Sequence, residues 1–223
     1  ILKKNYPTYI FFETGFLKRN IYRSLNINNM FGLSDFIPQN CPPDRFNKLD
    51  IVLKPYSING KYILITGQLP WDTQVQDINY NDWLNYIFKK IREITDRKIL
   101  FRFHPLYLEN NKHKMKINIP DFVEIDTNDN INDSLENAFC LVSYNSNSLI
   151  DAVIQGIPIF PMNKMSLVYN LGYQDLKKIN NPYIPTNEER QQVLNNISYM
   201  QWNLKEIESG EMMIYLENNY YDI

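Results

Sequence analysis

The sequence predicts an α/β fold: a Rossmann-like, mainly parallel sheet with flanking helices. Short apolar segments of strand length alternate with segments that have the spacing of amphipathic helices, which is the pattern of βαβ units. The chain has 223 residues, of which 44% are hydrophobic, so it can bury a core of that kind.

The first elements are expected near the N-terminus. Residues 7–12 are mostly apolar and predict a buried strand, which leads into Glu13, Thr14 and Gly15. Residues 17–49 are polar and rich in asparagine and proline, so they predict a long irregular connection.

The next elements begin the predicted sheet. The apolar run 62–66 predicts a strand that ends before Gly67. In 80–94, apolar residues recur at three- and four-residue spacing, as on one face of a helix, while charged residues occupy the other faces. A turn then leads into a strand at 98–103.

Later segments continue the alternation. We expect strands at 122–125, 139–144 and 157–160, with helices at 131–138 and 148–155. The tail at 187–208 predicts a longer helix, with acidic residues near its start and Gly210 as its stop signal.

The chain is expected to divide near residue 50. Residues 1–50 form a strand and a long loop region in this prediction, and residues 51–223 form the sheet domain with a C-terminal helix. Right-handed crossovers place the carboxyl ends of parallel strands on one edge, where open α/β sheets bind ligands. Polar residues that follow the strands, such as His104 and Tyr144, are therefore expected to gather at that edge.

Composition narrows the class of protein. The formal net charge of −2 argues against a strongly basic nucleic-acid binder. The two cysteines, Cys41 and Cys140, make neither a disulfide framework nor a metal-binding motif, which fits a reducing cytoplasm. The apolar runs are too short to span a membrane. No signal peptide is visible and the sequence starts at Ile1, so we expect a cytoplasmic protein or a fragment of one.

The segment Asn145-Ser146-Asn147-Ser148 precedes an apolar helix. Ser148 and Asp151 have the [ST]-x-x-[DE] spacing of a capping box, so one interpretation is a helix cap alone. The other is a phosphate site, because backbone N–H groups and the dipole at a helix N-terminus favour anions. Four small polar residues in a row favour the second interpretation, since one cap residue would suffice.

Further candidates follow the other strands. His104 precedes Pro105, which has no backbone N–H and restricts the chain, and the imidazole can donate hydrogen bonds to phosphate oxygens. Gln68 and Asp72 follow the strand at 62–66, and Gly67 would allow close approach of the backbone to a ligand. Gln68 is a candidate for binding the nucleotide, and Asp72 is the second candidate catalytic base after Glu13.

Glu13 also follows a predicted strand and is a candidate general base or a ligand for an acceptor hydroxyl, with a simple loop role as the alternative. The sequence has no G-x-G-x-x-G, no P-loop and no G-x-S-x-G motif. It also lacks a D-x-D motif, so we expect no metal ion to bridge a bound nucleotide.

Three segments resemble one protein family. The run Tyr9-Ile-Phe-Phe-Glu-Thr-Gly-Phe-Leu-Lys-Arg19, followed by Leu25-Asn-Ile-Asn28, resembles the "E-x-G-y-l-r-p" and "G-x-N" region of capsule polysaccharide biosynthesis proteins. These are bacterial glycosyltransferases of the GT-B kind and include transferases of the sugar acid Kdo. His104-Pro105 resembles the "HP" motif that these enzymes and bacterial sialyltransferases use on the nucleotide. Residues 146–158 resemble the family element "S-x-x-x-x-E-A-l-l-x-G-k-P".

The resemblance implies a GT-B-like nucleotide-binding half and transfer of a sugar from a CMP- or UDP-sugar, without a tightly bound cofactor or an essential metal. It implies that His104 and the turn at 145–148 hold the nucleotide phosphates, that Asp151 supports the ribose or the cap, and that Glu13 is the base. Residues 1–50 would then be a remnant or a minimal form of the acceptor domain. The acceptor is a glycan or, if the chain resembles compact phage enzymes, DNA.

Two departures from the family pattern keep other functions open. Thr14 stands where the family often has a second acidic residue, and Asp151 replaces a glutamate. A non-catalytic, glycosyltransferase-like binding module is one alternative. A nucleotide-sugar epimerase of similar fold is another, although the sequence offers few acidic residues for it.

Overall fold

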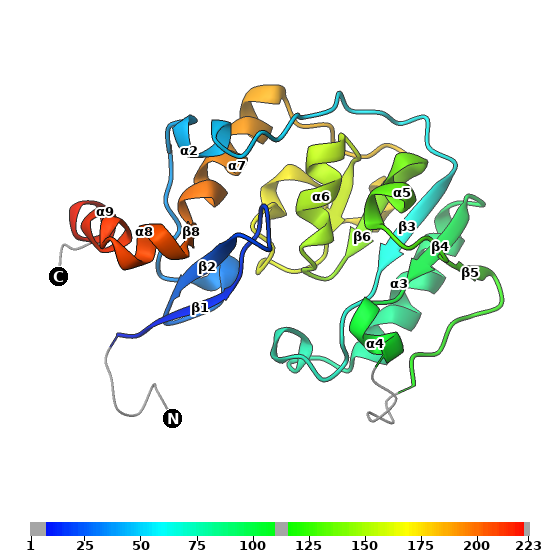
Figure 1. The fold of residues 1–223 in the computed structure, drawn as a ribbon. Helices are drawn as coiled ribbons and strands as arrows, with labels where there is room; N and C mark the ends of the chain where they lie inside the picture. Colours follow the sequence, from blue (N-terminus) through cyan, green and yellow to red (C-terminus); the bar gives the residue numbers. More distant parts are fainter. Residues whose placement is uncertain (1–7, 110–115, 221–223) are drawn as a thin grey trace. The chain divides into compact units, whose positions relative to one another are not determined.

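The computed structural model describes residues 8–109 and 116–220 (Figure 1). The chain forms two compact units: one contains residues 52–185, and the other combines residues 1–51 with residues 186–223. Each unit has its own sheet.

The unit of residues 52–185 contains a five-stranded sheet in the order β5-β4-β3-β6-β7. All four neighbouring pairs in this sheet are parallel. The strands are β3 (Tyr62–Thr66), β4 (Lys98–Arg102), β5 (Val123–Ile125), β6 (Ala138–Ser143) and β7 (Ile159–Pro161). With its flanking helices, this sheet confirms the predicted α/β, Rossmann-like fold.

Helices connect the strands of this sheet. They are α3 (Tyr80–Ile94), α4 (Pro105–Glu109), α5 (Ile131–Glu136) and α6 (Ser148–Gln155). Short 3₁₀ turns lie at Thr73–Val75, Tyr169–Leu171 and Leu176–Lys178. The boundaries of α3 and α6 are those expected from apolar spacing, whereas α4 was not expected because it is a single short turn after Pro105.

The apolar face of α3 explains its position. Leu84, Ile87, Phe88 and Ile91 follow helical spacing and have no exposed surface. They share one core with the strand residues of β3 and β4, including Phe101. Burial of this face supplies most of the stability of such a helix, because propensity alone is marginal at this length.

The other unit contains a three-stranded antiparallel sheet in the order β1-β2-β8. Its strands are β1 (Ile10–Thr14), β2 (Tyr22–Ile27) and β8 (Gln201–Asn203). Its helices are α2 (Asp44–Asn47), α7 (Asn187–Tyr199), α8 (Leu204–Glu208) and α9 (Glu211–Asn219), and a 3₁₀ turn lies at Phe31–Leu33. Residue 7 of the strand expected at 7–12 lies outside the described residues.

Two sequence predictions were wrong in this unit. Residues 17–49 are not wholly irregular, because β2 lies within them and pairs with β1. The predicted helix at 187–208 ends at Tyr199, since the next residues leave the helix and pair as β8 with β2. Both errors concern non-local strand pairing, which local apolar spacing does not reveal.

The C-terminal segment was assigned to the sheet domain from sequence, but it packs with the N-terminal segment instead. The buried Gln201 side chain accepts hydrogen bonds from the backbone N–H groups of Phe16 and Leu17, at 3.0 and 2.8 Å. The Tyr199 hydroxyl donates to the Asp44 carboxylate at 2.7 Å. Residues nearly two hundred positions apart in sequence therefore form one core.

Arg45 lies at the centre of these contacts and is only 8% exposed. It donates to both carboxylate oxygens of Glu206, at 3.0 and 3.1 Å. It also donates to the carbonyl oxygens of Ser198 and Gln201, at 3.1 and 2.9 Å. Its guanidinium lies 3.9 Å from the centre of the Trp202 ring, a cation–π distance.

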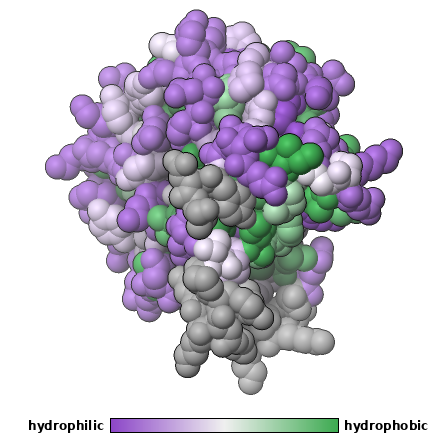
Figure 2. Space-filling model, turned by 90° about the vertical axis from the view of Figure 1, so that its left-hand side faces the viewer, coloured by the Kyte–Doolittle hydropathy of each residue, from purple (hydrophilic) through white to green (hydrophobic). Residues whose placement is uncertain are grey.

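Hydrophilic side chains cover most of the face shown in Figure 2, and hydrophobic side chains interrupt it over a smaller area. In the unit that contains the antiparallel sheet, large apolar residues with exposed surface include Phe12, Ile21, Leu204 and Ile214.

Within the described part of the chain, no helix is both long and apolar enough to cross a membrane.

Replacing Arg45 by leucine should strongly destabilise the protein. The change leaves the Glu206 carboxylate without its bidentate partner, and breaking a buried ion pair on one side typically costs about 3–5 kcal/mol. The matched control is Lys90→Leu, which breaks the more exposed Lys90–Glu93 pair and should change the unfolding free energy far less. Urea unfolding of both variants measures the difference, and equal losses would contradict the role of Arg45.

Candidate functional site

The strand order of the parallel sheet reverses at β3. The chain runs from β3 through β4 to β5 on one side, and then returns to place β6 on the other side of β3. Thr66, the last residue of β3, is in register with Arg102 of β4 and Ser143 of β6. Open α/β sheets bind ligands outside the carboxyl ends of the strands at such a reversal. The segments after Thr66, Arg102 and Ser143 therefore form the candidate site.

Gln68 and Asn145 join the two loops at this edge through a reciprocal pair of hydrogen bonds. The Gln68 amide donates to the Asn145 side-chain oxygen, and the Asn145 backbone N–H donates to the Gln68 side-chain oxygen at 3.2 Å. Both side chains are buried. The backbone N–H of Gln68 donates to the Tyr80 hydroxyl at 2.7 Å, and Asn145 donates to the carbonyl of Gln74. The two loops are thus held together by side chains whose polar atoms are satisfied.

Hydroxyl groups form a second set of contacts at the start of α6. The Ser148 hydroxyl lies 2.8 Å from the Thr66 hydroxyl and 3.0 Å from that of Ser146. The Ser143 hydroxyl donates to the carbonyl of Thr66 at 3.1 Å. These bonds fasten the first residue of α6 to the ends of β3 and β6.

The interpretation of Ser148 as the cap residue of a capping box is wrong. Asn147 occupies the N-cap position without a side-chain cap bond, and Ser148 is already the first helical residue. The Ser146 hydroxyl accepts from the backbone N–H of Ser148 at 3.3 Å, and the Ser146 carbonyl accepts from that of Leu149. Ser146 and Asn147 are half-buried, whereas Asn145 and Ser148 are buried. Ser146 and Asn147 are therefore the residues of this turn with the most surface to offer a ligand.

His104 and Pro105 lie just after β4. The Nδ1 atom of His104 accepts a hydrogen bond from the backbone N–H of Leu106 at 3.2 Å. In the neutral imidazole this places the proton on Nε2. Pro105 is the first residue of α4. A backbone N–H at this position has no partner within the helix, so proline costs no helical hydrogen bond there.

Two other candidates near this edge have local structural roles. Asp72 is the N-cap of the 3₁₀ turn after β3, and its carboxylate accepts from the backbone N–H of Gln74 at 3.0 Å. Gly67 is required by packing, because a Cβ atom there would lie 2.7 Å from the Phe101 ring. Gly67 thus approaches β4 closely, and its approach to a ligand stays a prediction. Asp151 is half-buried in the first turn of α6.

Arg102 and Asp126 form an ion pair at the same edge of the sheet. From sequence alone, Arg102 would be interpreted as a charge on the sheet surface. The Arg102 guanidinium lies 2.8 Å from Asp126, whose side chain is 1% exposed, and also donates to the carbonyls of Asn128 and Asp129. Burial alone would raise the pKa of Asp126, but hydrogen bonds from Ser134 and Arg102 outweigh it and hold that pKa below its ordinary value. These contacts fix the loop that follows β5.

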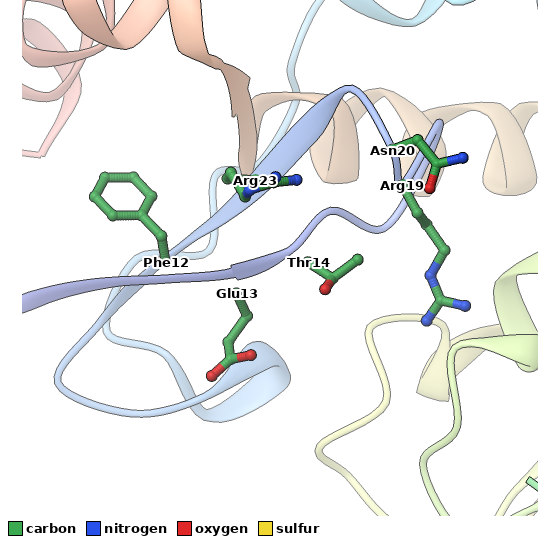
Figure 3. A pocket seen from close by; sticks show the side chains of 6 residues that line it. All are labelled: Phe12, Glu13, Thr14, Arg19, Asn20 and Arg23. Carbon is green, nitrogen blue, oxygen red and sulfur yellow. The ribbon is translucent and has the colours of Figure 1, made fainter. Parts of the chain in front are cut away.

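Glu13 belongs to the other unit, on the exposed edge strand β1. It lines an open pocket of about 520 Å³ at the β1–β2 hairpin, with Phe12, Thr14, Arg19, Asn20 and Arg23. Figure 3 shows the Glu13 carboxylate extending away from the strand. A Cβ atom at Gly15 would lie 2.7 Å from the carbonyl oxygen of Tyr22, so close packing against β2 accounts for the glycine at this position.

The structure thus brings together Gln68, Asn145, Ser146 and Ser148, with His104 at the same sheet edge. Thr66 and Ser143 were missed as members of this group. A polar residue that ends an apolar strand was the available signal for both. Among the described residues, no group of three or more histidine, cysteine or acidic side chains is placed to hold a metal ion.

No family profile matches the sequence, and neither does any curated protein. The fold is similar to that of KpsC from Thermosulfurimonas dismutans, a beta Kdo 2,4 transferase, with a TM-score of 0.57. The match covers 95% of this chain and 81% of that chain, at 11% sequence identity. The likeness is therefore one of fold, and it agrees with a GT-B-like architecture.

Replacing Asp126 by asparagine should destabilise the protein at neutral pH by roughly 3 kcal/mol, because Arg102 loses its buried counter-ion. The lowered pKa means that the carboxylate contributes stability above its unfolded pKa of about 3.9. This contribution is lost as the pH falls through the folded pKa. Unfolding free energies measured from pH 7 downward should fall less steeply for the variant than for the wild type.

The matched control for Asp126→Asn is Glu124→Gln, which removes the exposed carboxylate of the Lys98–Glu124 pair. This variant should keep the acid dependence of the wild type. An Asp126→Asn variant with wild-type stability at neutral pH and an unchanged acid slope would contradict the structural role of the pair.

Proposed function

We propose that this protein is a glycosyltransferase that binds a nucleotide-activated sugar at the carboxyl edge of the parallel sheet. The observation that carries the proposal is the position of the polar group formed by Gln68, Asn145, Ser146 and Ser148, at the reversal of strand order. This is the place where open α/β sheets bind nucleotides. The similarity of the fold to a sugar transferase supports the same class of ligand.

The residues at this edge suit a phosphate-bearing ligand. Ser146 and Asn147 lie in the turn before α6, whose N-terminal dipole favours an anion. His104, with the proton of its neutral form on Nε2, would donate to a phosphate oxygen from the neighbouring strand end. Gln68 and Asn145 would act indirectly, by holding their loops in one arrangement before the ligand binds.

In this proposal the donor is a CMP- or UDP-sugar and the acceptor supplies a hydroxyl group. Glu13 would accept the proton of that hydroxyl while the oxygen attacks the anomeric carbon of the donor. The bond from the anomeric carbon to phosphate then breaks, and the nucleotide leaves with the bonding electrons. Stabilisation of the leaving phosphate would be the task of His104 and the turn at 146–147.

A non-catalytic binding module is the second candidate, and two observations favour it. Asp72, the other carboxylate considered for catalysis, caps a 3₁₀ turn. Thr14 supplies no second carboxylate beside Glu13. A binding module would retain the nucleotide site and lack turnover of the sugar nucleotide.

Nucleotide binding tests the donor site. His104→Ala and Ser146→Ala should each weaken the binding of CMP or UDP by about tenfold to a hundredfold, because each variant loses one hydrogen bond to a charged group. Lys89→Ala, on the exposed face of α3, is the control and should bind like the wild type. Calorimetry on folded variants measures the affinities. Unchanged affinity in both site variants would mean that the turn only begins α6 and does not bind the nucleotide.

Glu13→Gln tests catalysis separately from binding. The amide preserves the shape of the side chain and removes its basicity, so sugar transfer should fall by about 10²–10⁴-fold while nucleotide affinity stays the same. Glu136→Gln is a control at a residue that lies in α5. Full activity in Glu13→Gln would assign the base to another residue, and parallel loss of stability and activity would give Glu13 a structural role.

A further inference from the structure

The pocket at the β1–β2 hairpin carries more positive than negative charge. Of the residues that line it, Arg19 and Arg23 are cationic and Glu13 is anionic. The ion pairs Arg45–Glu206, Lys90–Glu93, Lys98–Glu124 and Arg102–Asp126 involve none of these three side chains. None of these four ion pairs therefore occupies a charge that lines this pocket.

The two arginines are held differently. Arg23 is half-buried on β2, directly opposite Thr14 of β1, and one of its N–H groups donates to the carbonyl of Tyr22 at 3.1 Å. Arg19 is exposed in the loop that joins β1 to β2. A guanidinium has five N–H donors, so Arg23 retains donors after this bond. In Figure 3 the Arg19 and Glu13 side chains extend to the same side of β1.

We propose that this pocket binds a phosphate group carried by a saccharide acceptor, and that Glu13 faces the acceptor hydroxyl. The inference rests on the proposed glycosyltransferase function and specifies its acceptor. Two guanidinium groups suit a phosphate ester, which carries close to two negative charges and several acceptor oxygens. Asn20 and Thr14 add neutral polar groups of the kind that bind sugar hydroxyls.

The same pocket does not suit a polynucleotide acceptor. Binding of a nucleic-acid backbone depends on neutralising several phosphates along an extended basic surface. Here the pocket includes the Glu13 carboxylate beside its two arginines, and the whole chain has a formal net charge of −2. A single phosphate on a small acceptor matches this local charge better than a chain of phosphates does.

The test is a titration of the full chain with glucose 6-phosphate, glucuronate, glucose and a single-stranded oligonucleotide. Glucose 6-phosphate should bind most tightly and glucose least. The double variant Arg19→Gln, Arg23→Gln should weaken glucose 6-phosphate binding by about tenfold or more. Lys18→Gln is the matched control, because Lys18 adjoins Arg19 in sequence and does not line the pocket.

Three results would overturn the proposal: equal binding of glucose and glucose 6-phosphate, wild-type affinity in the double arginine variant, or a preference for the oligonucleotide. Titration of the same variants with CMP or UDP separates this proposal from the donor site. Nucleotide affinity should be unchanged by the arginine substitutions, since both residues belong to the unit that lacks the parallel sheet. If the wild type binds neither nucleotide, the glycosyltransferase proposal fails on its own, whatever the result for glucose 6-phosphate.

Discussion

The parallel pairing of β3 with β4 on one side and β6 on the other is the constraint on which the candidate site depends. Because β6 returns to the side of β3, the residues after two strands far apart in sequence meet at one edge. The hydrogen bonds of Gln68 to Asn145 and of Thr66 to Ser148 are possible only in this register. Without it, the turn at 145–148 would be an isolated helix start with no hydrogen-bonded loop beside it.

The polar groups at this edge satisfy two requirements at once. Buried Asn145 and Ser148 need hydrogen-bond partners, since an unpaired buried polar group destabilises the fold. They obtain partners from the neighbouring strand end, and this fixes the backbone of the turn. Ser146 and Asn147, which keep some exposed surface, are then presented from a rigid support. In the proposed site, structural and ligand-binding roles would thus be divided among adjacent residues.

The unit formed by residues 1–51 and 186–223 depends on a different set of interactions. Its small antiparallel sheet is assembled from two ends of the described chain, so distant segments must be fixed to each other. Arg45 does this by combining a bidentate ion pair with carbonyl contacts and the Trp202 ring. Such a buried charge is tolerated because its donors have partners of suitable geometry. Glu13 and the hairpin pocket are carried by the sheet that Arg45 helps to hold.

Local sequence patterns predicted the parallel sheet well. The apolar spacing in 80–94 and the short apolar strands are determined by nearby residues, so they can be recognised without the fold. Strands β2 and β8 could not be predicted in this way, because β2 forms by pairing with β1 and β8, and β8 forms by pairing with β2, which is distant from it in sequence. The gathering of His104 and Asn145 at one edge followed from topology. The bonds between Thr66, Ser146 and Ser148, and the ion pair of Arg102, required side-chain positions that no local pattern contains.

The central claim is that a nucleotide binds at the carboxyl edge of β3, β4 and β6. Hydrogen–deuterium exchange tests this claim most directly. Exchange of the full chain is compared with and without CMP or UDP. The account predicts slower exchange in three separate segments on nucleotide addition, at residues 66–69, 103–106 and 144–150, which follow β3, β4 and β6. Protection confined to residues 8–51 and 186–220, or no protection at saturating nucleotide, would contradict it.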